Sequence, residues 1–120
     1  MKSGNLVRDK SFDFALKIVS TYKELIRDQK EYVLSKQLLR SGTSVGANIE
    51  EAIGAQSRKD FFMKLTIAYK EAREAMYWIK LMHASQYLSD KKARELLDDV
   101  ASLCRVIGRI QLTMKERNNP

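Results

Sequence analysis

This chain of 120 residues has little of what shapes irregular or disulfide-bonded proteins: one proline, one cysteine and five glycines. The proline is the final residue, Pro120, so it interrupts no predicted element. With so few residues that favour turns, we expect long regular elements joined by short connections. The lone cysteine, Cys104, excludes an intramolecular disulfide and suits a reducing compartment. We therefore expect a cytoplasmic protein.

Long apolar runs are also missing. No segment approaches the roughly 20 apolar residues that span a bilayer, so we expect no membrane partner. The first residues, MKSGNLVRDKS, lack the apolar stretch that a secretory signal needs. Hydrophobic residues make up 44% and charged residues 31% of the chain, which is a globular balance. We expect residues 1–120 to form one domain.

Apolar residues recur at steps of three and four along the chain, which is the period of an amphipathic helix. This pattern predicts helices at about 10–29, 32–55, 58–87 and 89–116. Asp9 or Ser11 is the expected cap of the first helix, and Ser57 with Asp60 forms a capping pair before the third. Four long helices with short connections predict an all-α, up-down-up-down, left-handed four-helix bundle, with crossing angles near +20°.

Each predicted helix has an apolar stripe that we expect to form the core. In the first helix the stripe is Phe12, Ala15/Leu16, Val19, Tyr22 and Ile26. In the second it is Leu38, Gly42, Val45, Ile49 and Ala52/Ile53, and in the third it is Phe61, Leu65, Ala68, Ala72, Ala75, Ile79 and Met82. In the fourth it is Ala93, Leu96, Val100, Leu103, Ile107, Ile110 and Met114.

Glycines inside the second helix are unexpected, since each costs roughly 0.5–1 kcal/mol relative to alanine. Gly42 and Gly46 are four residues apart and therefore lie on one side of the helix. We expect them to let the alanine-rich third helix approach closely. Gly108 in the fourth helix is the candidate for another close approach.

No arrangement of residues predicts catalysis or a cofactor. The single histidine, His83, is preceded at three residues by Lys80, so the Glu-x-x-His motif of di-iron bundles is absent. Cys104 has no second cysteine with which to bind zinc. Gly42 and Gly46 are not followed by the Lys-Ser/Thr of a phosphate-binding loop. We expect no metal, no cofactor and no enzyme activity.

The net charge of +7 raises the possibility of a polyanionic partner, although no basic run or tail concentrates it. Basic residues at helical spacing are candidate phosphate contacts on the second and third helices: Lys36, Arg40, Arg58, Lys59, Lys70 and Arg73. The alternative is that such residues form surface ion pairs with Glu50, Glu71 and Glu74.

Beside the apolar stripe of the second helix runs a polar stripe, which consists of Ser41, Ser44, Asn48 and Glu51. One interpretation is a carboxylate and an amide in a binding cleft. The other, which we favour, is structural: these groups hydrogen-bond helix ends or fix the register between helices.

The segment QLLRSGTSVGANIEEA resembles the protein family encoded in 23S ribosomal RNA intervening sequences. The residues that match the family pattern are Gln37, Leu38, Arg40, Ser41, Ser44, Asn48, Ile49 and Glu51. The similarity continues through residues 57–61 and 65–68 and covers nearly the whole chain. The chain departs from the pattern at Glu50 and Ala52 and lacks the proline usual before the second helix.

This resemblance implies a four-helix bundle that assembles into a ring, with a homopentamer as the expected arrangement, and no enzyme activity. Similar basic pentamers that accompany retroelements bind nucleic acid. Two hypotheses follow: a homo-oligomer that contacts RNA or DNA through its basic surface, or an oligomeric scaffold for a protein partner. An enzyme would require a deep polar pocket near Asn48 and Glu51. Surplus apolar residues outside the core also predict self-association: Tyr77, Trp78, Val106 and Leu112.

Overall fold

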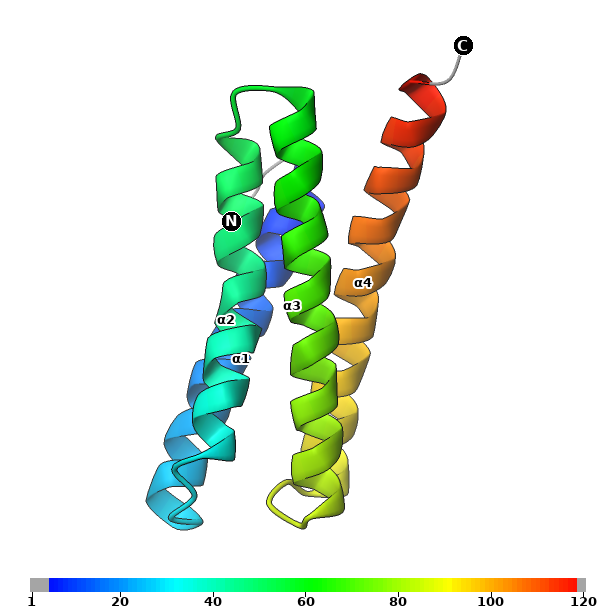
Figure 1. Ribbon diagram of the computed structural model, residues 1–120. Helices are drawn as coiled ribbons and strands as arrows, with labels where there is room; N and C mark the ends of the chain where they lie inside the picture. Colours follow the sequence, from blue (N-terminus) through cyan, green and yellow to red (C-terminus); the bar gives the residue numbers. More distant parts are fainter. Residues whose placement is uncertain (1–4, 119–120) are drawn as a thin grey trace.

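The computed structural model describes residues 5–118, and within them the chain forms four helices. Helix α1 is Leu6–Asp28, α2 is Leu34–Ile53, α3 is Arg58–Ala84 and α4 is Asp90–Asn118. Successive helices run in opposite directions and pack side by side, and α1 returns to pack against α4 (Figure 1). The predicted up-down-up-down four-helix bundle is confirmed, while the crossing angle stays a prediction.

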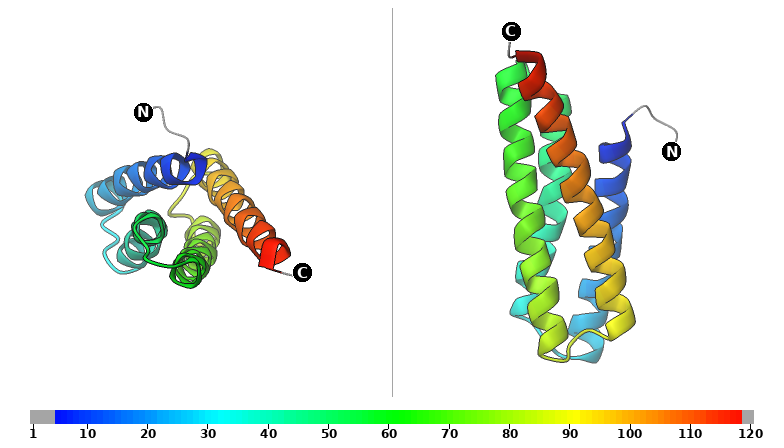
Figure 2. Two further views of the ribbon diagram at one scale, coloured as in Figure 1. Left: turned by 90° about the horizontal axis from the view of Figure 1, so that it is seen from above. Right: turned by 90° about the vertical axis from the view of Figure 1, so that its right-hand side faces the viewer.

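Viewed along its length, the bundle has α2 and α3 on one side and α1 and α4 on the other (Figure 2). The starts of α1 and α3 and the end of α4 lie at the same end of the molecule (Figures 1 and 2). Because α3 and α4 are antiparallel, residues near position 60 are brought close to residues near position 112. Gln111 Nε2 donates to Thr66 Oγ1 at 2.8 Å and so links the two helices there.

The predicted apolar stripes of α2, α3 and α4 form the core. Their central positions are almost fully buried, including the three alanines in the stripe of α3. Two members of these stripes, Phe61 and Ile110, are only partly buried, and Ile53 is exposed. The apolar periodicity of these three helices therefore predicted both the elements and the faces that they bury.

The predicted stripe of α1 is wrong. The helix buries a different set: Val7, Ser11, Phe14, Ile18, Thr21 and Leu25. Phe12 and Leu16, which we expected inside, are 63% and 55% exposed. The true stripe contains two hydroxyl side chains, and each satisfies its polar group within the helix: Ser11 Oγ donates to the Arg8 carbonyl at 3.0 Å and Thr21 Oγ1 to the Lys17 carbonyl at 2.8 Å. A satisfied hydroxyl can be buried at little cost, so hydrophobicity alone selected the wrong face.

The start of α1 was also misplaced. The helix begins at Leu6 rather than near residue 10, because the Asn5 side chain accepts a hydrogen bond from the Arg8 backbone amide at 3.0 Å. Asparagine is among the best helix caps, and it precedes the two caps that we had proposed.

The glycines of α2 face α1 and not α3. A Cβ atom added to Gly42 would lie 2.8 Å from Cγ1 of Ile18, and one added to Gly46 would lie 3.4 Å from the backbone oxygen of Ser11. The close approach that we predicted is therefore real, but its partner is the first helix. Gly108 marks no close approach, since nothing lies within 4 Å of the position where its Cβ would be.

Three short connections join the helices, and two of them contain one residue in the left-handed region: Lys30 with φ of 55° and Gln86 with φ of 71°. Helix α2 ends at Ile53 with Gly54 as its C-cap, and Ser57 Oγ accepts from the Asp60 amide at 3.0 Å to cap α3 as predicted. Ser89 Oγ caps α4 by accepting from the Lys92 amide at 3.1 Å.

Helix α2 has an unusual cap. The carboxylate of Glu31 accepts three backbone hydrogen bonds, from the amides of Val33, Leu34 and Ser35, at 2.7–3.1 Å. Burial is the largest single influence and raises the pKa of Glu31, but these three amides together lower it below its usual range. The predicted helix bounds leave Glu31 in the connection between the first two helices and give no sign of this cap.

Candidate nucleic-acid interface

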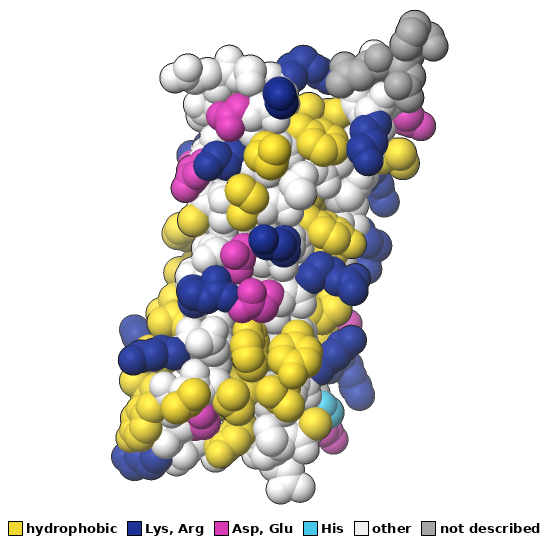
Figure 3. All heavy atoms as spheres, viewed as in Figure 1, with side chains coloured by type: hydrophobic (Ala, Val, Ile, Leu, Met, Phe, Trp, Pro, Cys, Tyr) yellow, Lys and Arg dark blue, Asp and Glu magenta, His cyan; other side chains and the backbone are white. Residues whose placement is uncertain are grey.

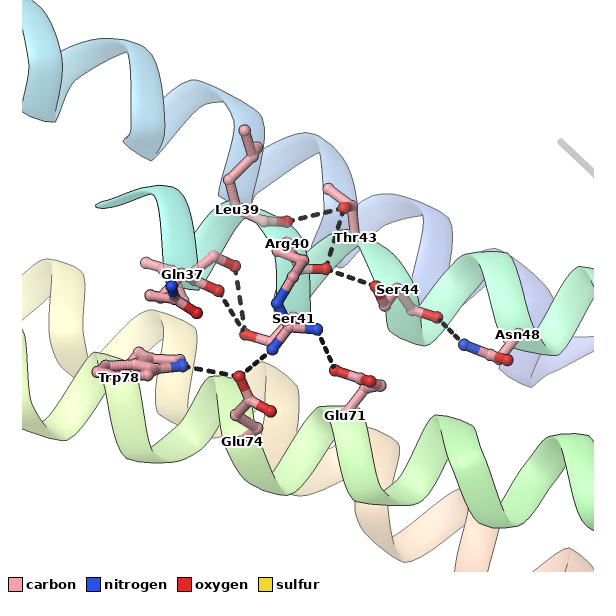
Figure 4. Close-up of polar contacts among 11 residues, drawn as sticks. Gln37, Leu39, Arg40, Ser41, Thr43, Ser44, Asn48, Glu71, Glu74 and Trp78 are labelled. Atoms are coloured by element: carbon pink, nitrogen blue, oxygen red, sulfur yellow. Dashed lines mark hydrogen bonds and ion pairs between the residues drawn. The ribbon is translucent and has the colours of Figure 1, made fainter. Parts of the chain in front are cut away.

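The polar stripe of α2 is held by contacts that stabilise the bundle. Ser44 Oγ donates to the Arg40 carbonyl at 2.6 Å, and Asn48 Nδ2 donates to the Ser44 carbonyl at 2.8 Å (Figure 4). Glu51 forms an ion pair with Lys64 of α3 at 2.8 Å. Only this last contact joins two helices, so the register role that we proposed belongs to Glu51, while Asn48 bonds within its own helix. Both contacts favour the structural interpretation.

Arg40 is engaged in ion pairs and is not a free cation. Its guanidinium contacts Glu71 at 3.2 Å and also Glu74, both on α3 (Figure 4). Trp78 Nε1 donates to the same Glu74 carboxylate at 3.0 Å. The Trp78 hydrogen bond and the Arg40 guanidinium lower the pKa of Glu74 against the opposing effect of burial. For Arg40, the ion-pair alternative is therefore confirmed.

The other candidate phosphate contacts have no ion pair among the described residues. Lys36 is exposed near the start of α2. Lys70 and Arg73 are exposed midway along α3, and Arg58 and Lys59 are exposed at its start. The six candidates therefore do not form one site, but the four on α3 lie on the helix that pairs with α4.

The structure adds cations from α4 that sequence reasoning missed. Burial raises the pKa of the Cys104 thiol above its usual value. Arg73 of α3 and Arg105 of α4 both lie near this thiol, and their charges offset part of that rise. Arg109, Lys115 and Arg117 continue along α4 toward the start of α3. We call Lys70, Arg73 and Arg105 the central basic face. The charge of residues 100–118, four basic against one acidic, was the signal that could have revealed the α4 contribution.

The surplus charge is concentrated on this pair of helices. Helix α3 carries six Lys/Arg and three Asp/Glu, and α4 carries seven and five, so the two supply five of the seven net charges. In the space-filling view, basic side chains follow the right-hand edge, over α4 and the adjoining side of α3 (Figure 3).

His83 and Cys104 lie apart. His83 Nε2 contacts Asp90 at 2.7 Å, beside the connection between α3 and α4. Cys104 follows Asp90 by 14 residues, which is about four turns of α4. Among residues 5–118, no group of three or more His, Cys, Asp or Glu side chains could hold a metal ion. Nor is any helix in that range long and apolar enough to cross a membrane.

Comparison with known proteins identifies the family. The model of the 23S rRNA-intervening sequence protein family matches residues 4–109. The chain belongs to this family. A solved structure of a protein of unknown function from the S23 ribosomal protein family of Bacteroides thetaiotaomicron is 47% identical to this family member, with a TM-score of 0.87. The match covers 88% of this chain and 98% of that one.

A second similarity is partial. The ADP-ribosylation factor GTPase-activating protein AGD1 of Arabidopsis thaliana is 37% identical over 91 residues. That stretch is 76% of this chain but only 9% of the plant protein. The family model and the solved structure confirm the resemblance noted from residues 37–51, for the family and for the fold.

Proposed function

We propose that this member of the 23S rRNA-intervening sequence protein family is a non-enzymatic homo-oligomer that binds RNA or DNA in the cytoplasm. The observation that carries the proposal is the central basic face. Lys70, Arg73 and Arg105 are exposed and have no ion pair among the described residues, so their charge remains available to phosphates. Phosphate neutralisation by such residues supplies most of the affinity of sequence-independent binding.

Self-association is supported by apolar side chains on the surface. Of the four that we expected to be surplus, Tyr77 and Leu112 are exposed, while Trp78 and Val106 are partly buried. Tyr77 meets Trp78 edge to face, with ring centroids 5.1 Å apart. Apolar side chains gather over the start of α2 and the end of α3 (Figure 3), and others are exposed along α1. Such patches favour an assembly, for which the family resemblance suggests a pentamer.

The test is a salt series of binding to labelled structured RNA. If three phosphates are contacted, affinity falls roughly 20–40-fold between 50 and 200 mM salt. Arg73→Glu should reduce affinity at least about tenfold, whereas Lys23→Glu, the same charge change on the outside of α1, should not. Affinity that is independent of salt, or equally sensitive to both variants, contradicts the proposal.

An oligomeric scaffold for a protein partner is the second candidate, and the same exposed apolar side chains support it. It predicts that the native assembly contains a stoichiometric protein partner after nuclease treatment, and that Arg73→Glu leaves this partner bound.

A further inference from the structure

We propose that the end of the bundle where α3 begins and α4 ends binds an acidic amphipathic helix of a partner protein. Two adjoining hollows of about 570 and 650 Å³ lie there and share Arg58 and Met114. We call them together the terminal groove. This inference goes beyond the proposed nucleic-acid contact, because it concerns a different class of partner and a groove outside the central basic face. Its rim includes two of the predicted phosphate contacts, Arg58 and Lys59.

The floor of the terminal groove is apolar, and its rim is basic. Apolar side chains from three helices form the floor: Leu6, Val7, Phe62, Met63, Val106, Ile110 and Met114. Five cations surround it: Arg58, Lys59, Arg109, Lys115 and Arg117. Among the described residues that line the two hollows, no side chain is acidic. The groove therefore complements a ligand that is both apolar and negatively charged.

Within residues 5–117, the cations of the rim have no carboxylate partner. None of the five forms an ion pair with a described residue, although the chain pairs Arg8, Lys17, Arg40 and Lys64 with carboxylates elsewhere. Lys115 Nζ instead lies 5.8 Å from the centre of the Phe62 ring. A carboxylate-bearing partner would supply the missing counter-charges and fix its own orientation.

The floor fits aliphatic side chains better than nucleobases. Bases bind to exposed aromatic faces, and the single ring here, Phe62, is contacted by Lys115. The remaining floor is aliphatic or methionine, and methionine adapts readily to irregular apolar partners. Leu6 and Met63 are 61% and 52% exposed, so both present apolar surface to a partner that enters the groove.

The length of the groove matches a short helix. Its lining on α4 extends from Val106 to Arg117, which is about 16 Å of helix. Three turns of a partner helix cover the same length, with apolar residues at i, i+3, i+4 and i+7 on the floor and carboxylates at the rim.

The experiment uses the full chain and a fluorescent 18-residue peptide with leucines at i, i+3, i+4 and i+7 and glutamates on the other face. A scrambled peptide of the same composition is the control. We expect the amphipathic peptide to bind at least about tenfold more tightly than the scrambled one. Arg109→Glu should weaken it by at least about tenfold, and Met63→Ser several-fold. Arg73→Glu, outside the groove, should leave its affinity within about twofold.

Three results would overturn the inference. Equal binding of the scrambled peptide would mean non-specific charge attraction. If single-stranded RNA competes with the peptide, and Met63→Ser weakens RNA binding as much as peptide binding, nucleic acid is the occupant of the groove. A smaller assembly on sedimentation of Arg109→Glu would make the groove an interface between copies. RNA titrations of Arg73→Glu, run in parallel, report on the proposed function independently.

Discussion

Two glycines in helix interiors have opposite consequences for stability. At Gly42 the absent side chain makes room for Ile18, whose Cγ1, Cγ2 and Cδ1 atoms would all lie within 3.2 Å of an added Cβ. Ile18 is fully buried, and its β-branched side chain has little rotamer freedom in a helix. At Gly108 an added Cβ would meet nothing within 4 Å.

We therefore expect Gly42→Ala to lower the free energy of unfolding by about 1–2 kcal/mol, because crowding outweighs the gain in helix propensity. Gly108→Ala should raise it by about 0.5–1 kcal/mol through propensity alone. Urea unfolding followed by Trp78 fluorescence, at one protein concentration, measures both. If Gly42→Ala instead stabilises the protein, α1 can shift away from α2 without a cost, and the prediction is wrong.

Glu31 makes the stability of α2 dependent on its charge. We expect Glu31→Gln to lower the free energy of unfolding at pH 7 by about 1–2 kcal/mol, in the range of lost helix caps. Glutamine keeps the size and one acceptor oxygen of the side chain but loses the negative charge near the start of α2.

The effect should depend on pH in one direction. The folded pKa of Glu31 lies below the unfolded value of about 4.3. Its stabilisation is therefore complete above the unfolded pKa and is lost as the pH falls through the folded one. The free energies of unfolding of the wild type and Glu31→Gln should therefore converge below about pH 4. A difference between them that stays constant down to pH 3 would contradict this.

At the scale of the element, Arg40 joins α2 to α3 through Glu71 and Glu74. Its side chain is 49% exposed, so solvent screens the pair. We expect Arg40→Gln to cost less than about 1 kcal/mol of stability. RNA affinity should change less than about twofold, because the guanidinium is already occupied. If Arg40→Gln loses as much RNA affinity as Arg73→Glu does in the same titration, Arg40 is a phosphate contact.

Helix α1 carries apolar side chains on both faces. Phe14 and Ile18 enter the core, while Phe12 and Leu16 face outward. An outer apolar face of this kind is stabilised when another chain covers it.

At the scale of the whole molecule, this outer face predicts an assembly. We expect the wild type to sediment as an oligomer at micromolar concentration, and Phe12→Glu with Leu16→Glu to shift it toward monomer. Both side chains are exposed, so the bundle should remain folded by circular dichroism. Ser20→Glu, exposed on the same helix, is the control. If the wild type is monomeric, the proposal that the protein acts as an oligomer is wrong.

The apolar pattern of the sequence is enough to locate the four helices and the buried faces of α2, α3 and α4. Their apolar residues recur at the helical period, and Ser57 caps α3 as its pairing with Asp60 predicts. The segment around Gln37–Glu51 also determined the family, since its pattern is specific.

Three features follow from the packing of the helices and could not be predicted from the sequence pattern: which helix meets the glycines, which face of α1 is buried and which cations remain free. Each depends on a partner that is distant in sequence: Ile18 for Gly42, Glu71 and Glu74 for Arg40, and the start of α3 for the end of α4. Helical periodicity describes one element at a time. Contacts between residues that are distant in sequence bury Ser11 and Thr21, pair Arg40 with its carboxylates and assemble the terminal groove.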